Sequence, residues 1–383
     1  MRVLVVNAGS SSLKLRVLDA AEQVQAGDDL PPLAGKELAD ALGRYLGNRS
    51  NSGASGSGGS SVDAVGHRIV HGGREYRGPV RLDDAVDAHL ERLAGLAPLH
   101  NPPAVEAART AHRLRPDLAQ VACFDTAFHS TLPEEAALYA LPWEWTQRWG
   151  LRRYGFHGLS HAWASRRAPE IMDRPPGDLR LVTAHLGAGA SLAAVSGGRS
   201  VDTTMGFTPL EGLVMATRSG TVDPGLVLWL QRHAGLGPEE LETALEERSG
   251  LLGVVGHSGD LRAVLAAVDD GDHRARLAYG MYLHRLRALV AAMAAAMGGL
   301  DGLAFTGGAG ERSARLRRDA CARLGFLGVE LDDRLNDGVG DGQPGADRLV
   351  SAARARVAAV VVTSREDIEI ARQVRQVLQA NRT

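Results

Sequence analysis

The stretch VLVVNAGSSSLKLRVLD, from Val3 to Asp19, has an apolar run, a turn of small polar residues and then an alternating segment. Leu13, Leu15 and Val17 recur with the period of two that is typical of a strand with one buried face. The small residues of the turn let backbone N–H groups approach an anion closely. The stretch therefore predicts two strands joined by a turn that can hold a phosphate.

A second stretch of this kind, LVTAHLGAGASLAAVS, runs from Leu181 to Ser196. Aligning the two pairs Asn7 with His185, Gly9 with Gly187 and, after a one-residue insertion, Ser12-Leu13 with Ser191-Leu192. One glycine-rich turn is weak evidence because such turns are common. Two copies, well separated along the chain, predict a duplicated fold with a nucleotide bound between its halves.

The composition of the 383 residues disfavours several classes of protein. The length favours two domains, and a formal net charge of -2 gives no reason to expect nucleic acid or an anionic membrane as a partner. No apolar run reaches the ~18 residues of a membrane span. Two cysteines cannot build a disulfide framework and the N-terminus has no signal pattern, so we expect a cytoplasmic protein.

Lysine is rare in this sequence. Of 43 basic residues only Lys14 and Lys36 are lysine, and Lys14 lies in the first predicted hairpin. A compact ammonium group suits a phosphate oxygen, whereas guanidinium is a broad fork. We therefore interpret Lys14 as a phosphate ligand in preference to a chance placement.

The order of apolar and helical segments predicts a mixed-sheet α/β protein rather than an unbroken series of strand–helix–strand units. Residues 48–61, NRSNSGASGSGGSS, cannot bury apolar area and are predicted to form a mobile surface loop. APLHNPP, residues 97–103, predicts a rigid turn before a helix at 104–114. Residues 250–262 predict a turn that leads into a helix.

Phosphate must be held without the common nucleotide-binding loops. The sequence has no GxxxxGK[ST] loop and no GxGxxG in a strand–helix–strand unit. This disfavours P-loop and dinucleotide enzymes, and leaves the hairpin turns and helix N-termini as phosphate sites.

Histidines stand four residues apart twice, His67 with His71 and His157 with His161. A zinc site is disfavoured, because neither pair has the HExxH glutamate and no cysteine ligand is near. Imidazolium groups beside phosphoryl oxygens are the better interpretation.

Arg68 and Arg218 lie among glycines and apolar residues rather than on charged helix faces. Such arginines suit a carboxylate or phosphoryl group that accepts two hydrogen bonds. Asp125 and Glu366 each follow a predicted strand. Either is a structural cap, or the two hold Mg²⁺, which takes one or two carboxylates plus phosphate oxygens.

Motifs along nearly the whole chain resemble one known family. In order they are NAGSSSLK, GHRIVHGG, APLHNPP, FDTAFH, RYGFHGLSH, HLGAGAS, TPLEGLVMATRSG, GLLGVVGHSGDLR, FTGGAGE and SREDIEIAR. The sequence thereby resembles acetate kinases, of the acetate/propionate/butyrate kinase group in the sugar kinase, Hsp70 and actin superfamily.

The resemblance implies an α/β fold of two duplicated actin-like, or ribonuclease H-like, domains. Each would be a mixed sheet flanked by helices, with an interdomain cleft that closes over the substrates. The first domain would comprise residues 1–126 and 365–383, and the second, nucleotide-binding domain residues 127–364. A homodimer is the assembly expected from the family.

The implied reaction is reversible in-line transfer of the ATP γ-phosphoryl group to acetate, giving acetyl phosphate and ADP, with Mg²⁺ or Mn²⁺. By this resemblance Asn7 and Glu366 lie at the metal. Because acetate is already ionised, the catalytic carboxylate, Asp125, organises metal and substrate rather than removing a proton.

The resemblance gives roles to further residues. Arg68 and Arg218 would hold the acetate carboxylate and the transferred phosphoryl group, and His157 would stabilise the transition state. The residues implied at the nucleotide and its phosphates are Ser10, Ser12, Lys14, His185, Leu186, Gly187, Ala188, Gly189, Asp260, Leu261, Arg262, Gly308, Ala309, Gly310, Glu311 and Arg312.

The family's methyl pocket corresponds to Val70, Leu99, Phe156 and Pro209, which are all apolar here. Val70 leaves little room beyond a methyl group. One methylene is worth about 1 to 3 kcal/mol, so propionate should be a poorer but real substrate. A propionate or other short-acid kinase, and a nucleotide-binding relative with little catalysis, are the alternatives.

Two turns depart from the family pattern. The usual HLGNGSS reads HLGAGAS, with Ala188 and Ala190 in place of asparagine and serine, and Arg312 replaces the asparagine of GEN. Losing one donor to a reacting phosphate costs about 10² to 10³ in rate. We therefore expect slower turnover or a changed phosphoryl donor, with pyrophosphate as a less favoured option.

Overall fold

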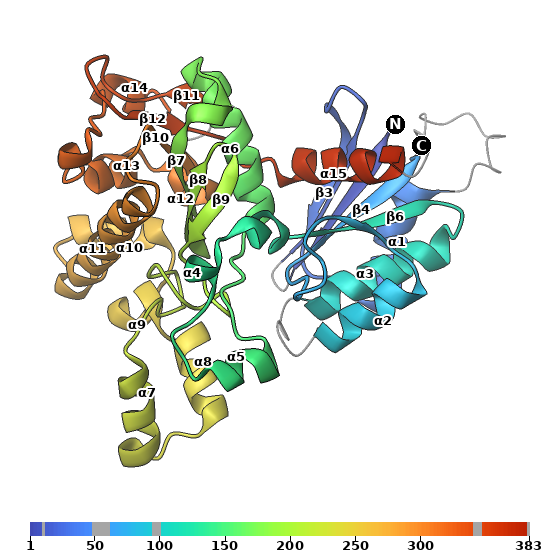
Figure 1. Cartoon of the computed structure of the whole chain (residues 1–383), viewed down its shortest axis with the longest axis horizontal. Helices are drawn as coiled ribbons and strands as arrows, with labels where there is room; N and C mark the ends of the chain where they lie inside the picture. The colour runs from blue at the N-terminus through green and yellow to red at the C-terminus, as the bar shows by residue number, and fades with distance from the viewer. Residues whose placement is uncertain (10–11, 48–61, 94–100, 340–346, 381–383) are drawn as a thin grey trace. The chain divides into compact units, whose positions relative to one another are not determined.

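The computed structural model describes residues 1–9, 12–47, 62–93, 101–339 and 347–380. The chain divides into two compact units, Met1–Ser130 with Arg365–Thr383 and Thr131–Ser364 (Figure 1). Each unit contains one six-stranded sheet. The predicted loop at 48–61 lies outside the described residues.

In the first unit the strands lie in the order β3-β2-β1-β4-β6-β5. β1, β4 and β6 run parallel, whereas β2, β3 and β5 are antiparallel to their neighbours, so the sheet is mixed. The strands are β1 (Val3–Ala8), β2 (Leu13–Leu18), β3 (Val24–Leu30), β4 (Ala64–Ile69), β5 (Val80–Arg81) and β6 (Ala119–Phe124).

Helices cover both faces of this sheet because side chains alternate between the two faces along each strand. Leu4 and Val6 of β1 form a core with leucines of α1 (Gly35–Leu46) and alanines of α3 (Asn101–Leu114). A short helix, α2 (Asp84–Arg92), packs on α3. This face holds a large apolar cluster of buried residues.

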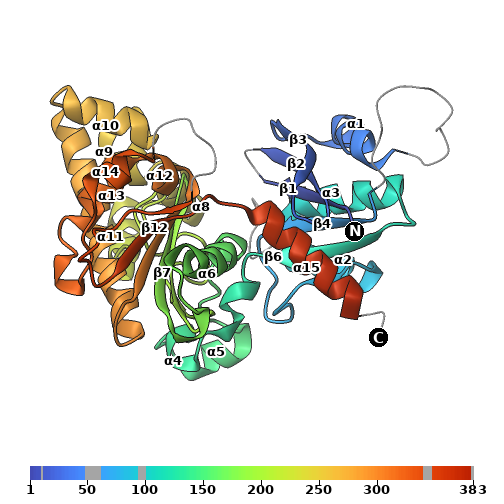
Figure 2. The same ribbon diagram turned by 90° about the horizontal axis from the view of Figure 1, so that it is seen from above.

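The opposite face is covered by α15 (Glu366–Ala380), the last helix of the chain. α15 packs on β1, β4 and β6, and Figure 2 shows it lying along the sheet. A Cβ at Gly66 of β4 would lie 2.6 Å from a methyl group of Val374 and 2.7 Å from one of Ile370. Glycine at this position therefore allows the helix to approach the sheet closely.

The second unit repeats the strand order of the first. Its order is β9-β8-β7-β10-β12-β11, and each strand has the same direction relative to its neighbours as its counterpart in the first sheet. The strands are β7 (Arg180–Leu186), β8 (Ala190–Ser196), β9 (Arg199–Thr203), β10 (Gly302–Thr306), β11 (Arg348–Leu349) and β12 (Ala358–Val361). The predicted fold of two duplicated mixed α/β sheets is confirmed.

The helices of the second unit differ more from those of the first. α6 (Gly158–Met172) packs on β7, β10 and β12, and α11 (His273–Ala296) packs on β7, β8 and β9. The other α-helices are α4 (Glu134–Ala137), α5 (Trp143–Trp149), α7 (Pro224–Trp229), α8 (Pro238–Glu247), α9 (Gly250–Val255), α10 (Leu261–Asp269), α12 (Gly307–Arg312), α13 (Ala314–Cys321) and α14 (Asp333–Asp337). Among the described residues no helix is long and apolar enough to cross a bilayer.

The expected equivalence of the two hairpins is partly wrong. Asn7 pairs with Lys14 and His185 pairs with Ser191, so the counterpart of Ser191 is Lys14 and not Ser12. The reason is the length of the turns, because the first hairpin has four residues between its strands and the second has three.

Two local predictions also need correction. α3 begins at Asn101, so the Asn-Pro-Pro segment forms the first helical turn instead of a rigid turn before it. Proline suits this place because the first N–H groups of a helix have no partner within the helix. Gly250–Val255, predicted as a turn, is the short helix α9.

Candidate active site

Four polar side chains of the first unit meet at the carboxyl ends of its parallel strands. Arg68 of β4 forms an ion pair with Asp125, which follows β6, at 2.6 Å between Nη2 and Oδ2. Its Nη1 donates to Asn7 Oδ1 at 3.2 Å. Asn7 Nδ2 in turn donates to Glu366 Oε2 at 3.2 Å, and Arg68 Nε lies 3.9 Å from the same oxygen. We call these residues the Arg68 cluster.

The fold explains why these four residues meet. Asn7 is at the end of β1, Arg68 is at the end of β4, and Asp125 follows β6, so that all three lie at one edge of the sheet. Glu366 is the first residue of α15, which packs on the same strands. The positive end of that helix dipole favours a carboxylate at this position.

Burial controls the electrostatics of the Arg68 cluster. The Asp125 side chain is 1% exposed, and burial raises the pKa of its carboxyl group, a shift that the Arg68 guanidinium opposes. Burial also acts to lower the pKa of Arg68, but the charges of Asp125 and Glu366 outweigh it and raise that pKa overall. With both carboxyls ionised, one guanidinium faces two negative charges.

The donor set of the Arg68 cluster fits a hard cation. Glu366 supplies a carboxylate and Asn7 an amide oxygen, and Mg²⁺ is bound in proteins by one or two carboxylates together with water and phosphate oxygens. The excess of negative charge also favours a divalent cation. Within the described part of the chain no group of three or more His, Cys, Asp or Glu residues is arranged to hold a metal by itself.

In the second unit, His157 has a backbone conformation that non-glycine residues rarely adopt. Its φ is 55° and it immediately precedes α6. Its ring stacks on that of His185 of β7, with 4.3 Å between ring centroids. A Cβ at Gly189 would lie 3.2 Å from His157 Nε2 and 3.6 Å from Arg218 Nη1. The turn after β7 thus lies against both His157 and Arg218, and backbone strain of this kind is often found at functional sites.

Arg218 is held by an acidic partner that the sequence analysis missed. Its Nε lies 2.9 Å from Glu246 Oε2 of α8, and both side chains are about one-fifth exposed. Glu246 occurs on an ordinary acidic helix, so its sequence carries no signal of this role. The pair fixes Arg218 while one side of its guanidinium faces the turn after β7.

A second acidic residue braces the irregular segment between β9 and α7. Glu211 accepts hydrogen bonds from the Tyr139 hydroxyl and from Arg153 Nη2, both at 2.7 Å. Arg153 Nη1 also donates to the carbonyl groups of Thr204 and Met205. This network fixes the segment that leads to Arg218, and Glu211 belongs to the TPLEG motif.

Three of the segments predicted to bind the nucleotide lie in the second unit, and contacts link them there. Gly307 has a φ of 76°, and a Cβ there would lie 2.9 Å from the backbone of Leu186. The Ala216 N–H donates to the Ala188 carbonyl at 3.1 Å. A Cβ at Gly259 would lie 2.4 Å from the Ala216 carbonyl oxygen. The turn after β7, the start of α10 and the start of α12 are therefore joined through backbone that only glycine permits to approach so closely.

The polar side chains of these segments have different surroundings. Asp260 caps α10 and forms an ion pair with Arg262 at 2.6 Å, and both are exposed. Glu311 of α12 is partly buried, which raises the pKa of its carboxyl group, and it accepts a hydrogen bond from the Ser364 N–H at 2.9 Å. Gly308 has open space where a Cβ would be, so a flat group can approach the α12 backbone there.

The remaining predicted residues are placed as follows. Lys14 is exposed and is paired with Asn7 across the β1–β2 hairpin, so both side chains project from one face of the sheet. Val70 is buried in the first unit, and Phe156 is buried in the second unit with Pro209 partly buried. The predicted methyl pocket draws on both units, and Ser10 and Leu99 lie outside the described residues.

The interpretation of all four paired histidines as imidazolium groups is wrong for two of them. His67 and His71 are buried, and burial lowers the pKa of each to about 4, so both rings are neutral near pH 7. His67 Nε2 lies 2.7 Å from the side-chain amide of Gln120, and His71 Nδ1 accepts a hydrogen bond from the Gly73 N–H. These rings belong to the interior of the first unit.

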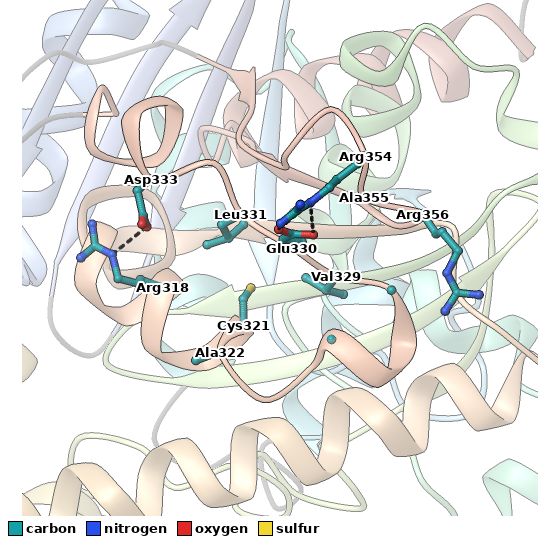
Figure 3. A pocket seen from close by; sticks show the side chains of 12 residues that line it. Arg318, Cys321, Ala322, Val329, Glu330, Leu331, Asp333, Arg354, Ala355 and Arg356 are labelled. Carbon is teal, nitrogen blue, oxygen red and sulfur yellow. Dashed lines mark hydrogen bonds and ion pairs between the residues drawn. The ribbon is translucent and has the colours of Figure 1, made fainter.

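A cavity of about 450 Å³ in the second unit lies near the end of α13 (Figure 3). Figure 3 shows the ion pairs Arg318–Asp333 and Glu330–Arg354 among its lining side chains. None of the predicted site residues lines it. Because four of its five charged lining side chains are paired with one another, we do not assign the chemistry to this cavity.

Comparison with known proteins identifies the family. The model of the Acetokinase family matches residues 32–372. An acetate kinase of Streptomyces coelicolor is 44% identical over 398 residues, covering 97% of this chain and 96% of that protein. The crystal structure of Porphyromonas gingivalis acetate kinase matches with a TM-score of 0.87 and 36% identity, covering 98% of this chain and 99% of that one.

A propionate kinase structure is similar to nearly the same degree. The crystal structure of a propionate kinase from Francisella tularensis matches with a TM-score of 0.86 and 33% identity, covering 97% of this chain and 98% of that one. The match to the family model and the full-length similarity together show that this chain belongs to the Acetokinase family, whose members are phosphotransferases with ATP/ADP as co-substrate and a carboxyl group as acceptor.

Proposed function

We propose that the chain catalyses the reversible transfer of the ATP γ-phosphoryl group to acetate, giving acetyl phosphate and ADP. The observation that carries this proposal is the Arg68 cluster, in which a partly buried guanidinium and a buried carboxylate lie beside an oxygen-rich donor set. Family membership supports the same reaction.

The chemistry requires positioning more than a strong base. Acetate is a carboxylate near pH 7 and attacks phosphorus directly, so no proton has to be removed from the nucleophile. Arg68 has the fork geometry that orients a carboxylate through two hydrogen bonds. Arg218 supplies positive charge to the phosphoryl oxygens, whose charge spreads in the transition state. The bond to the ADP oxygen breaks as the bond to the acetate oxygen forms.

Asn7 and Glu366 are the residues that we propose hold Mg²⁺, with Mn²⁺ as a substitute. When bound, the metal supplies positive charge to the phosphate oxygens. Asp125, held by Arg68, organises metal and substrate, and Arg68 links it to Asn7 and Glu366. Lys14, on the same face of the hairpin as Asn7, is suited to a phosphate oxygen.

The nucleotide is assigned to the second unit. The turn after β7 offers the backbone of Gly187, Ala188 and Gly189 to the nucleotide. The starts of α10 and α12 are the other two segments that we assign to nucleotide binding. Open space at Gly308 supports contact with a flat adenosine, and exposed Arg312 supplies a cation nearby.

An acyl-phosphate assay tests the proposal. The full chain is incubated with MgATP and acetate, propionate or butyrate, and acyl phosphate is trapped as the hydroxamate. We expect acetate to give the highest kcat/KM, with propionate lower by about 5- to 150-fold, the equivalent of about 1 to 3 kcal/mol per methylene. GTP and pyrophosphate are run as alternative donors.

Two results would change the assignment. A higher kcat/KM for propionate would favour the propionate kinase alternative, which the similarity to the Francisella tularensis structure supports. ATP binding without any trapped acyl phosphate would favour a nucleotide-binding relative with little catalysis.

The proposal includes a homodimer that works in the cytoplasm. Leu226, Leu228 and Trp229 of α7 are each about half exposed, an apolar surface that supports self-association. Light scattering on the purified chain measures the mass directly, and a monomer at working concentrations would contradict this part of the proposal.

A further inference from the structure

A line of hydrogen bonds leads from the interior of the second unit to His157. His161 Nδ1 lies 2.8 Å from Thr183 Oγ1, and His161 Nε2 lies 2.7 Å from Ser191 Oγ. Ser191 Oγ lies 2.9 Å from His157 Nδ1. Thr183, Ser191 and His161 are each 0% exposed. The elements that contribute are α6, β7 and β8.

The direction of the protons along this line follows from the two hydroxyl groups. Within the described residues, the Thr183 hydroxyl has one hydrogen-bond partner, His161 Nδ1. A buried hydroxyl proton without an acceptor costs about 1 to 3 kcal/mol, so Thr183 donates to Nδ1. His161 then carries its proton on Nε2 and donates it to Ser191 Oγ. Ser191, having accepted from His161, donates its own proton to His157 Nδ1.

The consequence is a fixed tautomer for His157. Because Nδ1 accepts from Ser191, the proton of a neutral His157 ring is on Nε2. That nitrogen lies beside Gly189, where a Cβ would be 3.2 Å away, and Arg218 Nη1 would be 3.6 Å from the same Cβ. The opposite tautomer would present a lone pair there, which repels phosphoryl oxygens.

We infer that His161, together with Thr183 and Ser191, is a positioning residue that holds His157 as an Nε2–H donor beside Arg218 for the transferring phosphoryl group. The inference rests on the proposed function for the identity of the acceptor. The hydrogen-bond line itself is independent of it.

Two substitutions separate this role from a packing role. The side chain of His161→Gln has an oxygen that accepts from Thr183 and an N–H that donates to Ser191, so it preserves the direction of the line. His161→Leu fills similar space and breaks the line. His284→Gln, at an exposed position of α11, is the matched control.

The direct test is the tautomer of His157, measured by long-range ¹H–¹⁵N NMR on the full chain with ¹⁵N-labelled histidine. The His157 signals are assigned by their loss in His157→Gln. We expect the Nε2–H tautomer in the unaltered chain and in His161→Gln, and its loss in His161→Leu. An Nδ1–H tautomer or a doubly protonated ring at pH 7.5 in the unaltered chain would overturn the inference.

Kinetics give the second measurement. We expect His161→Leu to lower kcat about 10- to 100-fold with a smaller change in the KM for ATP, as for other groups that orient a functional imidazole. His161→Gln should recover most of that loss and His284→Gln should show none. A full kcat in His161→Leu would also overturn the inference.

The inference can still be tested if His161→Leu does not fold or if the chain shows no kinase activity. If His161→Leu does not fold, the spectra of the unaltered chain and of His161→Gln still decide. If the unaltered chain makes no acyl phosphate with any acid, the proposed function fails, whereas the tautomer measurement still tests the hydrogen-bond line.

Discussion

Arg68 and Asp125 form an ion pair in which the carboxylate is nearly inaccessible to water. Removing one partner of such a pair leaves the other charge buried without compensation, at a cost of about 3 to 5 kcal/mol. We expect Arg68→Met to lower the free energy of unfolding by this amount at pH 8 and to abolish measurable acyl-phosphate formation.

The pH dependence of that loss has a definite sign. Burial already raises the pKa of Asp125, and losing Arg68 raises it further. A carboxyl group whose pKa is raised in the folded state costs stability that grows as the pH rises from the unfolded-state pKa to the folded-state pKa, and it costs none at a pH below both. Urea unfolding of both chains should therefore show a smaller difference at pH 5 than at pH 8. Arg44→Met, which breaks the exposed pair with Asp28, is the control, and an equal loss at both pH values would contradict this reasoning.

Ala188 is the residue at which a gain of function is expected. It is exposed, and its backbone carbonyl is already bonded to the Ala216 N–H, so an asparagine side chain has room to project. Ala188→Asn restores a donor at the turn after β7 and should raise kcat by up to about 10²-fold. Steady-state kinetics with ATP and acetate measure it, and an unchanged kcat would show that this donor is not limiting.

Single residues could be predicted where a motif surrounds them. Asn7, Arg68 and Asp125 each stand in a distinctive stretch, and the structure brings them together. Glu246 could not be predicted, because its contact with Arg218 depends on how α8 packs, and nothing in the helix sequence marks it.

At the scale of elements, the close packing of α15 on the first sheet depends on Gly66. Gly66→Ala would place a methyl group into the Ile370 and Val374 side chains and force the helix outward. Overpacking of this kind costs about 1 to 3 kcal/mol. We also expect a higher Mg²⁺ requirement, because Glu366 moves with the helix. Urea unfolding and Mg²⁺ titration of activity are the measurements.

Gly43→Ala is the matched control for this change. Gly43 is inside α1 with nothing within 4 Å of a Cβ, so alanine should stabilise the chain by about 0.5 to 1 kcal/mol. Equal effects of the two substitutions would show that α15 tolerates displacement.

Elements with strong periodicity could be predicted, and exposed ones could not. β1 and β2 have clear apolar patterns and were expected near their observed bounds. β3, Val24–Leu30, was missed because all seven of its residues are exposed or partly exposed, in a sequence, VQAGDDL, with weak strand preference. Its place at the sheet edge comes from pairing with β2, which local sequence does not report.

At the scale of the whole molecule, the duplication assigns different chemistry to corresponding positions. β1 and β7, β2 and β8, and β4 and β10 correspond in the two sheets. In the first sheet Lys14 lies opposite Asn7, and in the second sheet Ser191 and Thr306 lie opposite His185. Ser191 therefore corresponds to Lys14. By the register of β1 with β4, Thr306 corresponds to Arg68. The first unit thus has charged groups where the second has hydroxyl groups.

This difference predicts where nucleotide alone will bind. We expect ADP without acetate to slow hydrogen–deuterium exchange at 186–189, 259–262 and 307–312 of the second unit. These segments are linked through backbone contacts and respond together. Mass spectrometry with and without ADP measures the change, with 238–247 of α8 as an internal reference. Protection confined to the first unit would contradict the assignment.

The first unit is completed by α15, which follows all of Thr131–Ser364 in the sequence. During translation, both sheets can therefore form before the ribosome has released the residues that cover the Gly66 face. That face stays uncovered in the nascent protein, open to chaperones or to aggregation. A stop codon just after Ser364 would yield a protein with an intact second unit and a first unit whose sheet has one face uncovered.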